Sequence, residues 1–171
     1  MALHTQTIGT TMTAGFAGSY ARQPDMIVIT APLGGTTPVA FGSPLKRDKT
    51  GNVVLLGAES TAENFVGVAA RELKSSLHYL DQSVGQYAPA EPVSVFQRGS
   101  IQVKCQRGTP AIGGKVYVRI TENASYSTAV VGGFEAEADS AKTIELTNCQ
   151  WGGAADSNGV TELVILSRIN A

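Results

Sequence analysis

Alternation of apolar and polar residues is the clearest pattern in this chain. In Ile101–Gln106 the two kinds of residue change places at every step. Val116–Ile120 repeats the pattern, with Tyr117 and Arg119 at its polar positions. A strand with one face in the core and the other in water has this period of two. Both segments are therefore predicted to be β-strands, with Arg119 outside the core.

Further short apolar runs, separated by glycine and proline, extend the pattern over most of the chain. The predicted strands are Met26–Thr30, Pro44–Arg47, Val53–Leu56, Phe65–Ala70, Val93–Phe96, Ile101–Cys105, Val116–Ile120, Ala129–Val131, Thr143–Leu146 and Thr161–Ile169. Asn158-Gly159, just before the last of them, is the strongest short hairpin signal. Many short strands at close spacing predict a mainly β fold, a single β-barrel or β-sandwich domain of the jelly-roll or tulip-like kind.

Two segments depart from simple alternation. Leu163–Leu166 is apolar on both faces, which predicts a strand covered by the core on one side and by an arm or a partner subunit on the other. In Arg71–Asp81, leucines recur at helical spacing with charged residues opposite. This segment is either one short amphipathic helix, the only helix we expect, or a strand followed by a loop.

Residues 1–25 show no sustained period and are rich in Thr, Gly, Ala and Gln. Such a segment buries little by itself, so it is either an arm or a frayed terminus. Tyr20 and Met26 are large apolar groups that would be stabilised by docking, and Arg22 adds a fork of hydrogen-bond donors. We therefore expect an N-terminal arm over 1–25 and a β domain over 26–171.

The composition narrows the possible functions. Charged residues make up 16% of the 171 residues, against about 25% in typical proteins, while glycine is abundant at 19 residues. The net charge is −1 and no basic run is visible, which disfavours a nucleic-acid binder. The first residues lack the regions of a signal peptide, and no apolar stretch is long enough to span a bilayer. We therefore expect synthesis in a cytoplasm and no contact with a membrane.

No motif predicts catalysis, a metal site or a cofactor. The segment Gly108–Val116 resembles a phosphate-binding loop, but Gly114 precedes the lysine and Val116 replaces the hydroxyl residue, so a hairpin connection is predicted instead. His78 and Asp81 could belong to a nucleophilic triad, but no nucleophile elbow accompanies them.

The remaining candidate groups favour structural roles. Glu135 and Glu137 share a strand face and are expected to be solvated. Cys105 and Cys149 are expected to be buried small hydrophobic residues rather than a disulfide or zinc ligands. Trp151 is expected to serve core packing or a subunit contact rather than stacking on a sugar or base.

Several stretches, in order along the chain, resemble bacteriophage structural cement proteins. These are Ser19–Met26, Phe65–Glu72, Tyr87–Val95, Arg98–Ile101, Gly113–Arg119 and Val164–Arg168. The resemblance covers most of the chain and consists of strand and turn segments without a catalytic motif. Residues 36–60 and 73–84 resemble the family less, and nothing is carried over to them.

The resemblance implies a β-rich, noncatalytic decoration protein on the outer capsid surface of a virion, where it stabilises the expanded head. Its partner would be the major capsid (coat) protein, and its assembly a homotrimer or, alternatively, a dimer. The hypothesis for the binding site is that Tyr20, Arg22, Pro24 and Met26 contact the coat or a neighbouring subunit. The alternatives are a virion-surface receptor- or carbohydrate-binding β module, which would expose aromatic residues such as Trp151, and a small β-barrel hydrolase or isomerase that uses His78.

Overall fold

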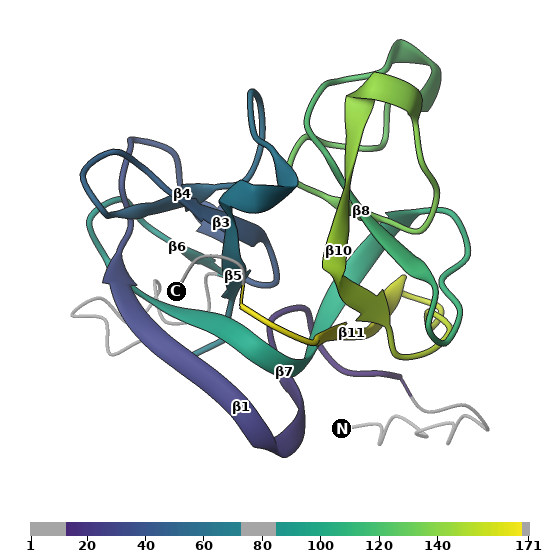
Figure 1. Ribbon diagram of the computed structural model, residues 1–171, viewed down its shortest axis with the longest axis horizontal. Coiled ribbons are helices and arrows are strands. Elements are labelled where there is room, and N and C mark those ends of the chain that lie inside the picture. Colours follow the sequence, from purple (N-terminus) through teal and green to yellow (C-terminus); the bar gives the residue numbers. More distant parts are fainter. Residues whose placement is uncertain (1–12, 73–84, 169–171) are drawn as a thin grey trace, which may run out of the picture.

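The computed structural model describes residues 13–72 and 85–168 (Figure 1). Its strands are β1 (Tyr20–Pro32), β2 (Val39–Ala40), β3 (Pro44–Arg47), β4 (Val53–Leu55), β5 (Phe65–Ala69), β6 (Gln86–Tyr87), β7 (Pro92–Arg107), β8 (Lys115–Arg119), β9 (Phe134–Glu135), β10 (Thr143–Trp151) and β11 (Val160–Ile165). Short 3-10 turns lie at η1 (Ala62–Asn64), η3 (Ala124–Tyr126) and η4 (Ser140–Lys142), and the described residues contain no α-helix. The prediction of a mainly β barrel domain is confirmed.

The long strand β7 runs through both halves of the molecule (Figure 1). Its second half belongs to a closed barrel, because β7 pairs with β11, β11 with β10, β10 with β8, β8 with β9, and β9 again with β7. Its first half continues the same nine-stranded sheet, with β1 on one side and β5, β3 and β4 on the other. A parallel bridge between Leu33 and Val53 joins the residue after β1 to β4, so this part of the sheet also curls back on itself.

Each half has its own hydrophobic core. The barrel core is made of buried side chains from the barrel strands, among them Ile101, Val103, Val116, Val118, Phe134, Leu146, Trp151, Leu163 and Ile165. The second core holds Ala31, Leu33, Val39, Phe41, Leu45, Val53, Val66, Ala69, Tyr87, Val93 and Val95. Strand β5 is buried along its whole length, because Phe65 and Val68 contribute to the first core while Val66 and Ala69 contribute to the second. The two halves are therefore packed into one unit.

Three details of the strand prediction are wrong. Val93–Phe96 and Ile101–Cys105 are parts of the single strand β7, which bends at Gly99 rather than ending there. Ala129–Val131 forms no strand. The connection Gly108–Gly114 is no hairpin, because β9 lies between β7 and β8 in the sheet. For β7 and for the Gly108–Gly114 connection, the local pattern indicated extended or turning backbone, but the pairing partner comes from elsewhere in the chain. Ala129–Val131 is an apolar run in a loop, so its prediction as a strand was wrong.

The turn before β11 is confirmed in atomic detail. The amide of Asp156 donates to the Val160 carbonyl, and the Gly159 amide donates to the Asp156 carbonyl. The Asp156 carboxylate accepts bonds from the Asn158 and Val160 amides, as expected of an aspartate that opens a turn. In the strand that follows, Leu163 is buried but Leu166, just beyond its end, is 51% exposed. The described residues thus cover one face of Leu163–Leu166, and cover of the other face by a partner stays a prediction.

Strand β1 begins within the segment that was predicted to be an arm. Residues just before it are also tied to the barrel: Gly18 donates to Gln102, Gln102 donates to Ser19, and the Ala14 amide donates to Asp156. A domain boundary at residue 25 stays a prediction, although β1 crosses it without a break. The predicted helix in Arg71–Asp81, with His78, lies almost wholly outside the described residues.

Candidate functional site

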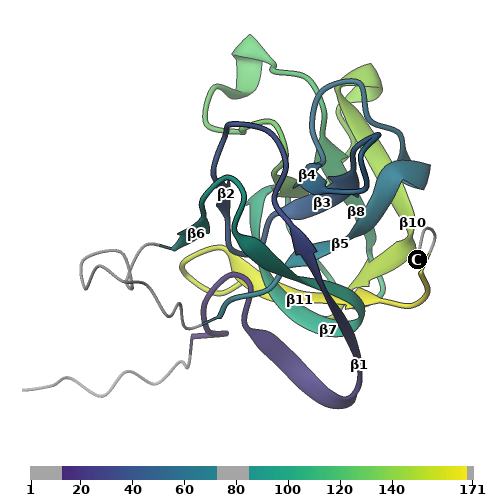
Figure 2. The same ribbon diagram turned by 90° about the vertical axis from the view of Figure 1, so that its left-hand side faces the viewer.

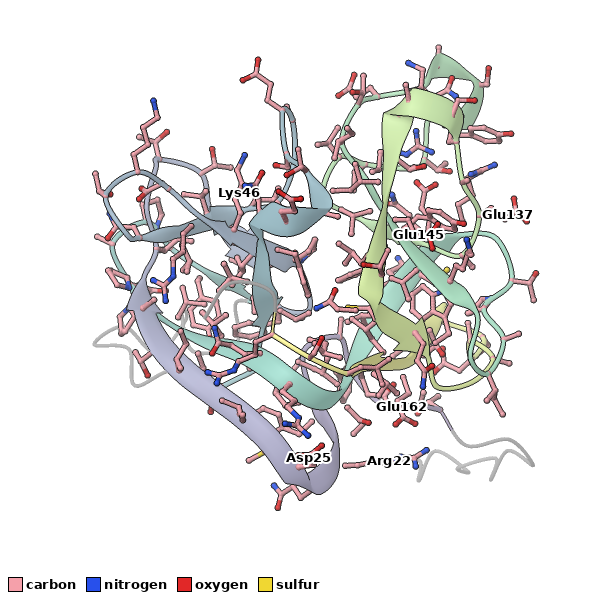
Figure 3. The ribbon with its side chains drawn as sticks, in the orientation of Figure 1. Arg22, Asp25, Lys46, Glu137, Glu145 and Glu162 are labelled. Atoms are coloured by element: carbon pink, nitrogen blue, oxygen red, sulfur yellow. The ribbon has the colours of Figure 1, made fainter. Side chains whose placement is uncertain are left out.

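The predicted contact residues Tyr20, Arg22, Pro24 and Met26 all lie in the first half of β1. Figure 3 shows this segment at the lower end of the molecule, where Arg22 and Asp25 are labelled and Glu162 lies beside them. The structure therefore brings the four positions together along one strand, which we name the β1 rim (Tyr20–Met26). Whether they contact a coat protein stays a prediction.

Tyr20 anchors the start of the β1 rim. Its ring lies 5.7 Å from the ring of Phe96, between centroids, and its hydroxyl donates a 2.6 Å hydrogen bond to Glu72 Oε1. Burial, followed by the hydrogen bond and negative charge of Glu72, raises the pKa of Tyr20 far above its usual value. The Tyr20 hydroxyl therefore stays protonated and donates to Glu72. Because its ring packs against Phe96, Tyr20 is partly a structural residue and not a freely exposed contact.

Arg22 connects the β1 rim to the barrel. Its Nε lies 2.8 Å from Glu162 Oε1, and its Nη2 donates a 2.9 Å hydrogen bond to Glu162 Oε2. Glu162 belongs to β11, on the opposite side of β7, so this two-point ion pair crosses the central strand. The Arg22 side chain is nevertheless 70% exposed. Nothing in the sequence links residue 22 to residue 162, so sequence analysis missed this pairing.

The middle of the β1 rim bulges away from β7. Arg22 is opposite Ser100 and Ile27 is opposite Arg98, so four residues of β1 correspond to the single residue Gly99 of β7. Gly99 has a φ of 104°, and a Cβ there would lie 2.5 Å from the Asp25 carbonyl oxygen. Only glycine combines this backbone angle with so close an approach. Gly99 was predicted to lie in a turn. In the structure it lies within β7, where the lack of a side chain lets the bulge of β1 approach the backbone.

A surface hollow of about 380 Å³ lies between this bulge and the end of β11. Its lining combines charged groups from Arg22, Asp25 and Arg98 with apolar groups from Val164 and Leu166. Arg98 Nη2 lies 3.3 Å from Asp25 Oδ2, so these two charges are already paired. The hollow can receive a small apolar side chain with polar flanks.

A second hollow, of about 360 Å³, lies between the two halves of the molecule. Most of its lining is apolar, including Phe41, Leu55 and Phe134, and among the described residues that line it Lys104 is the charged one. Acid–base catalysis needs paired titratable groups with matched pKa values, and this lining does not supply them.

A buried ion network corrects two predictions. Arg119 and Glu135, both expected on solvated faces, have fully buried side chains that form a two-point pair with Nε–Oε1 at 2.6 Å and Nη2–Oε2 at 3.0 Å. Arg119 Nη1 also donates to Asp139 Oδ2 at 2.9 Å. Arg107 lies 3.2 Å from Glu135, and through the other carboxylate oxygen Glu135 accepts a bond from Gln106. The segment that follows β8 folds over the strand's polar face and encloses these charges.

This network has the character of a structural support. A hydrogen bond from Asn123, together with Arg119, lowers the pKa of Asp139, so its carboxylate stays charged at neutral pH. Each charged group of the network lies within 3.2 Å of an opposite charge, and the pairs connect β7, β8 and β9 with the segment before β10. We therefore assign the network to the stability of the segment between β8 and β10.

Other residues singled out by sequence lie in the core. Cys105 and Cys149 are buried and unpaired, as predicted. Trp151 is 1% exposed and packs edge-on against Phe134, so it is unavailable for stacking on a sugar. His78 and Asp81 lie outside the described residues. Within residues 13–72 and 85–168, no group of three His, Cys, Asp or Glu side chains is placed to hold a metal ion. Over the same ranges, no helix is long and apolar enough to cross a membrane.

The sequence matches the model of a protein family described as structural cement protein (E217 gp24/Pam3 gp6), and the match runs over residues 4–166. The chain belongs to this phage structural cement protein family. The strand and turn segments that resembled cement proteins therefore identified the family correctly. No curated protein matches the sequence at a significant level.

A solved structure described as the capsid of Myoviridae phage XM1 resembles this cement protein with a TM-score of 0.69 and 17% identity, covering 99% of this chain and 100% of that chain. At this identity the likeness establishes the fold alone. The head fiber gp8.5 N base of bacteriophage phi29 gives a TM-score of 0.40 and 12% identity over 85% of this chain and 99% of that chain, which is too weak to carry an argument. Family membership gives the cement protein a structural, capsid-associated role in a phage virion.

Proposed function

We propose that this cement protein binds the outer surface of the phage head through the β1 rim and stabilises the expanded shell by bridging neighbouring coat subunits, without catalysing a reaction. The observation that carries the proposal is the rim itself. It presents an exposed guanidinium at Arg22 and is paired along β7. Beside it lies the hollow whose apolar walls come from Val164 and Leu166.

The attachment matters because a clamp that is rigid before binding loses little conformational entropy when it binds. Tyr20 is held by Glu72, Arg22 by Glu162 and Asp25 by Arg98, so side chains on three sides position the rim. Arg22 has five N–H donors, and those that do not face Glu162 remain for carbonyls or a carboxylate of the coat. Tyr20 and Met26, both half-buried, would add apolar contact at the same place.

Binding by a small surface is sufficient for a protein that acts in many copies. Each copy contributes a modest interface, but a homo-oligomer that bridges adjacent coat subunits engages several interfaces at once, and the combined affinity exceeds that of any single one. The low charge of the chain suits this use, since few charged groups would have to be desolvated when an interface forms. The partner in this proposal is the coat protein.

The test is co-sedimentation of the purified chain with expanded heads assembled without it. We expect saturable binding at a simple ratio to the coat protein and a higher temperature of head disruption. Heads that neither bind the chain nor become more stable in its presence would overturn the proposal.

The site assignment is tested with Arg22→Glu. We expect binding at least about tenfold weaker, because the reversed charge meets Glu162 and removes the exposed donors. Lys49→Glu is the matched control, since Lys49 is an exposed cation on the turn between β3 and β4, away from the rim. The paired variant Arg22→Gln with Glu162→Gln removes the ion pair without creating repulsion. If both Arg22 variants fold and bind like wild type, the rim is the wrong surface.

A further inference from the structure

Strand β1 has one unpaired edge. It is 13 residues long, yet among the described elements it pairs with β7 alone. The strands β3, β5, β7, β8, β9, β10 and β11 have neighbours on both sides, and β4 is bridged to Leu33 on its second side. In Figure 1, β1 forms the lower left border of the molecule, and in Figure 2, which faces that side, no labelled strand lies in front of it.

The register identifies the backbone groups on this edge. The Ser94 carbonyl accepts a 2.8 Å hydrogen bond from the Ala70 amide, on the side of β7 that faces away from β1. Ser94 is paired with Thr30, so this is an antiparallel pair without mutual hydrogen bonds. The N–H and C=O of Thr30 therefore point away from β7, and by alternation those of Val28 do as well. Ile29, opposite Val95, directs its backbone groups towards β7.

The side chains leave this edge without the usual protection. Proteins shield open edges with lysine, proline or an inward charge, and an apolar edge without them invites pairing with another strand. No charged residue occurs in Met26–Ala31. Ile27, Val28 and Ile29 are only half-buried in the isolated chain. Pro32 limits the open stretch at its end, because it has no N–H to donate.

We propose that this edge pairs with β1 of a second copy of the chain, antiparallel and about a two-fold axis. In the described residues no other long strand offers an open edge, so strand pairing between copies has to use β1 from both. Such a self-complementary contact generates a closed dimer. The register places Ile29 opposite Ile29 of the second copy and Val28 opposite Thr30. Val28 and Thr30 then exchange both of their outward hydrogen bonds, and Pro32 stands opposite Met26 and ends the ladder on each side.

The interface is small. A ladder of this length, with the half-buried side chains of Ile27 and Ile29, covers less than the roughly 800 Å² per partner of a stable complex. We therefore expect a dimer with a dissociation constant in the micromolar range when the chain is free. The pairing uses Ile27–Ala31, and within the β1 rim it reaches Met26 alone, opposite Pro32 at the end of the ladder. The exposed guanidinium of Arg22 lies outside the paired stretch, so both contacts can form at once. It is independent of the proposed binding to the coat.

Sedimentation equilibrium of the isolated full chain, from about 1 µM to about 1 mM, tests the association. We expect a monomer–dimer equilibrium that Thr30→Lys weakens by at least about tenfold, because a charge on the open edge has to be desolvated when the strands pair. Thr36→Lys, at an exposed threonine outside β1, is the matched control and should associate like wild type. Thr30→Pro removes the outward N–H and should weaken the dimer as well.

Cross-linking tests the register. Antiparallel pairs without mutual hydrogen bonds have Cα atoms about 4.5 Å apart, a distance that a disulfide can bridge. Ile29→Cys should therefore form a disulfide-linked dimer under mild oxidation, and Thr36→Cys should not. Cys105 and Cys149 are buried and do not compete.

Three results would overturn the proposal: a chain that stays monomeric over the whole range, a trimer, or a dimer that Thr30→Lys leaves unchanged. If the chain stays monomeric but Thr30→Lys loses binding to heads, a coat strand occupies the edge and the second copy does not. Binding of the wild-type chain to heads decides the proposed function separately in every case.

Discussion

The pair formed by Arg119 and Glu135 offers the sharpest test of how this fold is held together. Both side chains are fully buried, and their two contacts measure 2.6 and 3.0 Å. Removing one member leaves the other as a buried charge with an incomplete set of partners. In proteins, breaking a buried pair in this way costs about 3–5 kcal/mol. After Glu135→Leu, Arg119 keeps its contact with Asp139, so we expect a cost near the lower limit, about 3 kcal/mol.

That cost is a large part of the total stability, which is about 5–15 kcal/mol for ordinary domains. For a chain of this size each kcal/mol shifts Tm by about 2–4 °C, so Glu135→Leu should lower Tm by about 6–12 °C. Arg22→Met is the matched control, because it breaks an ion pair whose arginine is 70% exposed. Exposed pairs contribute about 0–1 kcal/mol, so this control should lower Tm by less than about 4 °C.

The assay is denaturant unfolding followed by the fluorescence of Trp151, the one tryptophan of the chain, which packs against Phe134 beside the network. A double-mutant cycle with Arg119→Met measures the coupling, and the double variant should cost less than the sum of the two single variants by about 1–3 kcal/mol. If Glu135→Leu costs no more than Arg22→Met, or if the two single costs simply add, the network does not support the fold as described.

Three further predictions concern stability and reactivity. Gly99→Ala should destabilise the chain by about 1–3 kcal/mol, because it forces a Cβ against the Asp25 carbonyl at a positive φ; an unchanged unfolding midpoint would contradict the bulge. Asp139, whose pKa is lowered by the bond from Asn123 and by nearby arginines, stabilises the fold above the ordinary carboxyl pKa of about 4, and this contribution is lost as pH falls through the lower folded value. Asp139→Asn should therefore flatten the acid limb of a plot of Tm against pH, and a limb as steep as wild type would count against it. Burial raises the pKa of the Cys149 thiol, so alkylation should wait for unfolding; rapid labelling of Cys149 in the native chain would show that the barrel opens.

Local patterns predicted those parts of the fold that depend on neighbours in sequence. The alternation in Ile101–Gln106 places Ile101 and Val103 in the core, where both are fully buried. The Asp156–Gly159 turn forms as expected, because an aspartate that caps its own turn and a glycine at positive φ need no distant partner. Strand and turn residues also carried the family resemblance that the family match confirms.

Patterns failed where the answer depended on what covers a strand. Alternation correctly placed Arg119 on the face opposite Val118, but it does not report whether water or protein lies on that face. Here the segment after β8 returns over the strand and brings Asp139 within 2.9 Å of the guanidinium. Glu135 was also expected to be solvated, but in the structure it is buried and pairs with Arg119. No signal within a few residues of either position reveals this.

The sequence by itself determined the strand content, the main turns, the absence of a recognised catalytic motif and the family, because each depends on residue type and short-range order. Tertiary structure alone decided that β7 runs through both halves of the molecule, that Arg22 pairs with Glu162 and that β1 is left with an open edge. These features join residues separated by up to 140 positions, as Arg22 and Glu162 are. They form only when the chain folds and both halves of the molecule pack against β7.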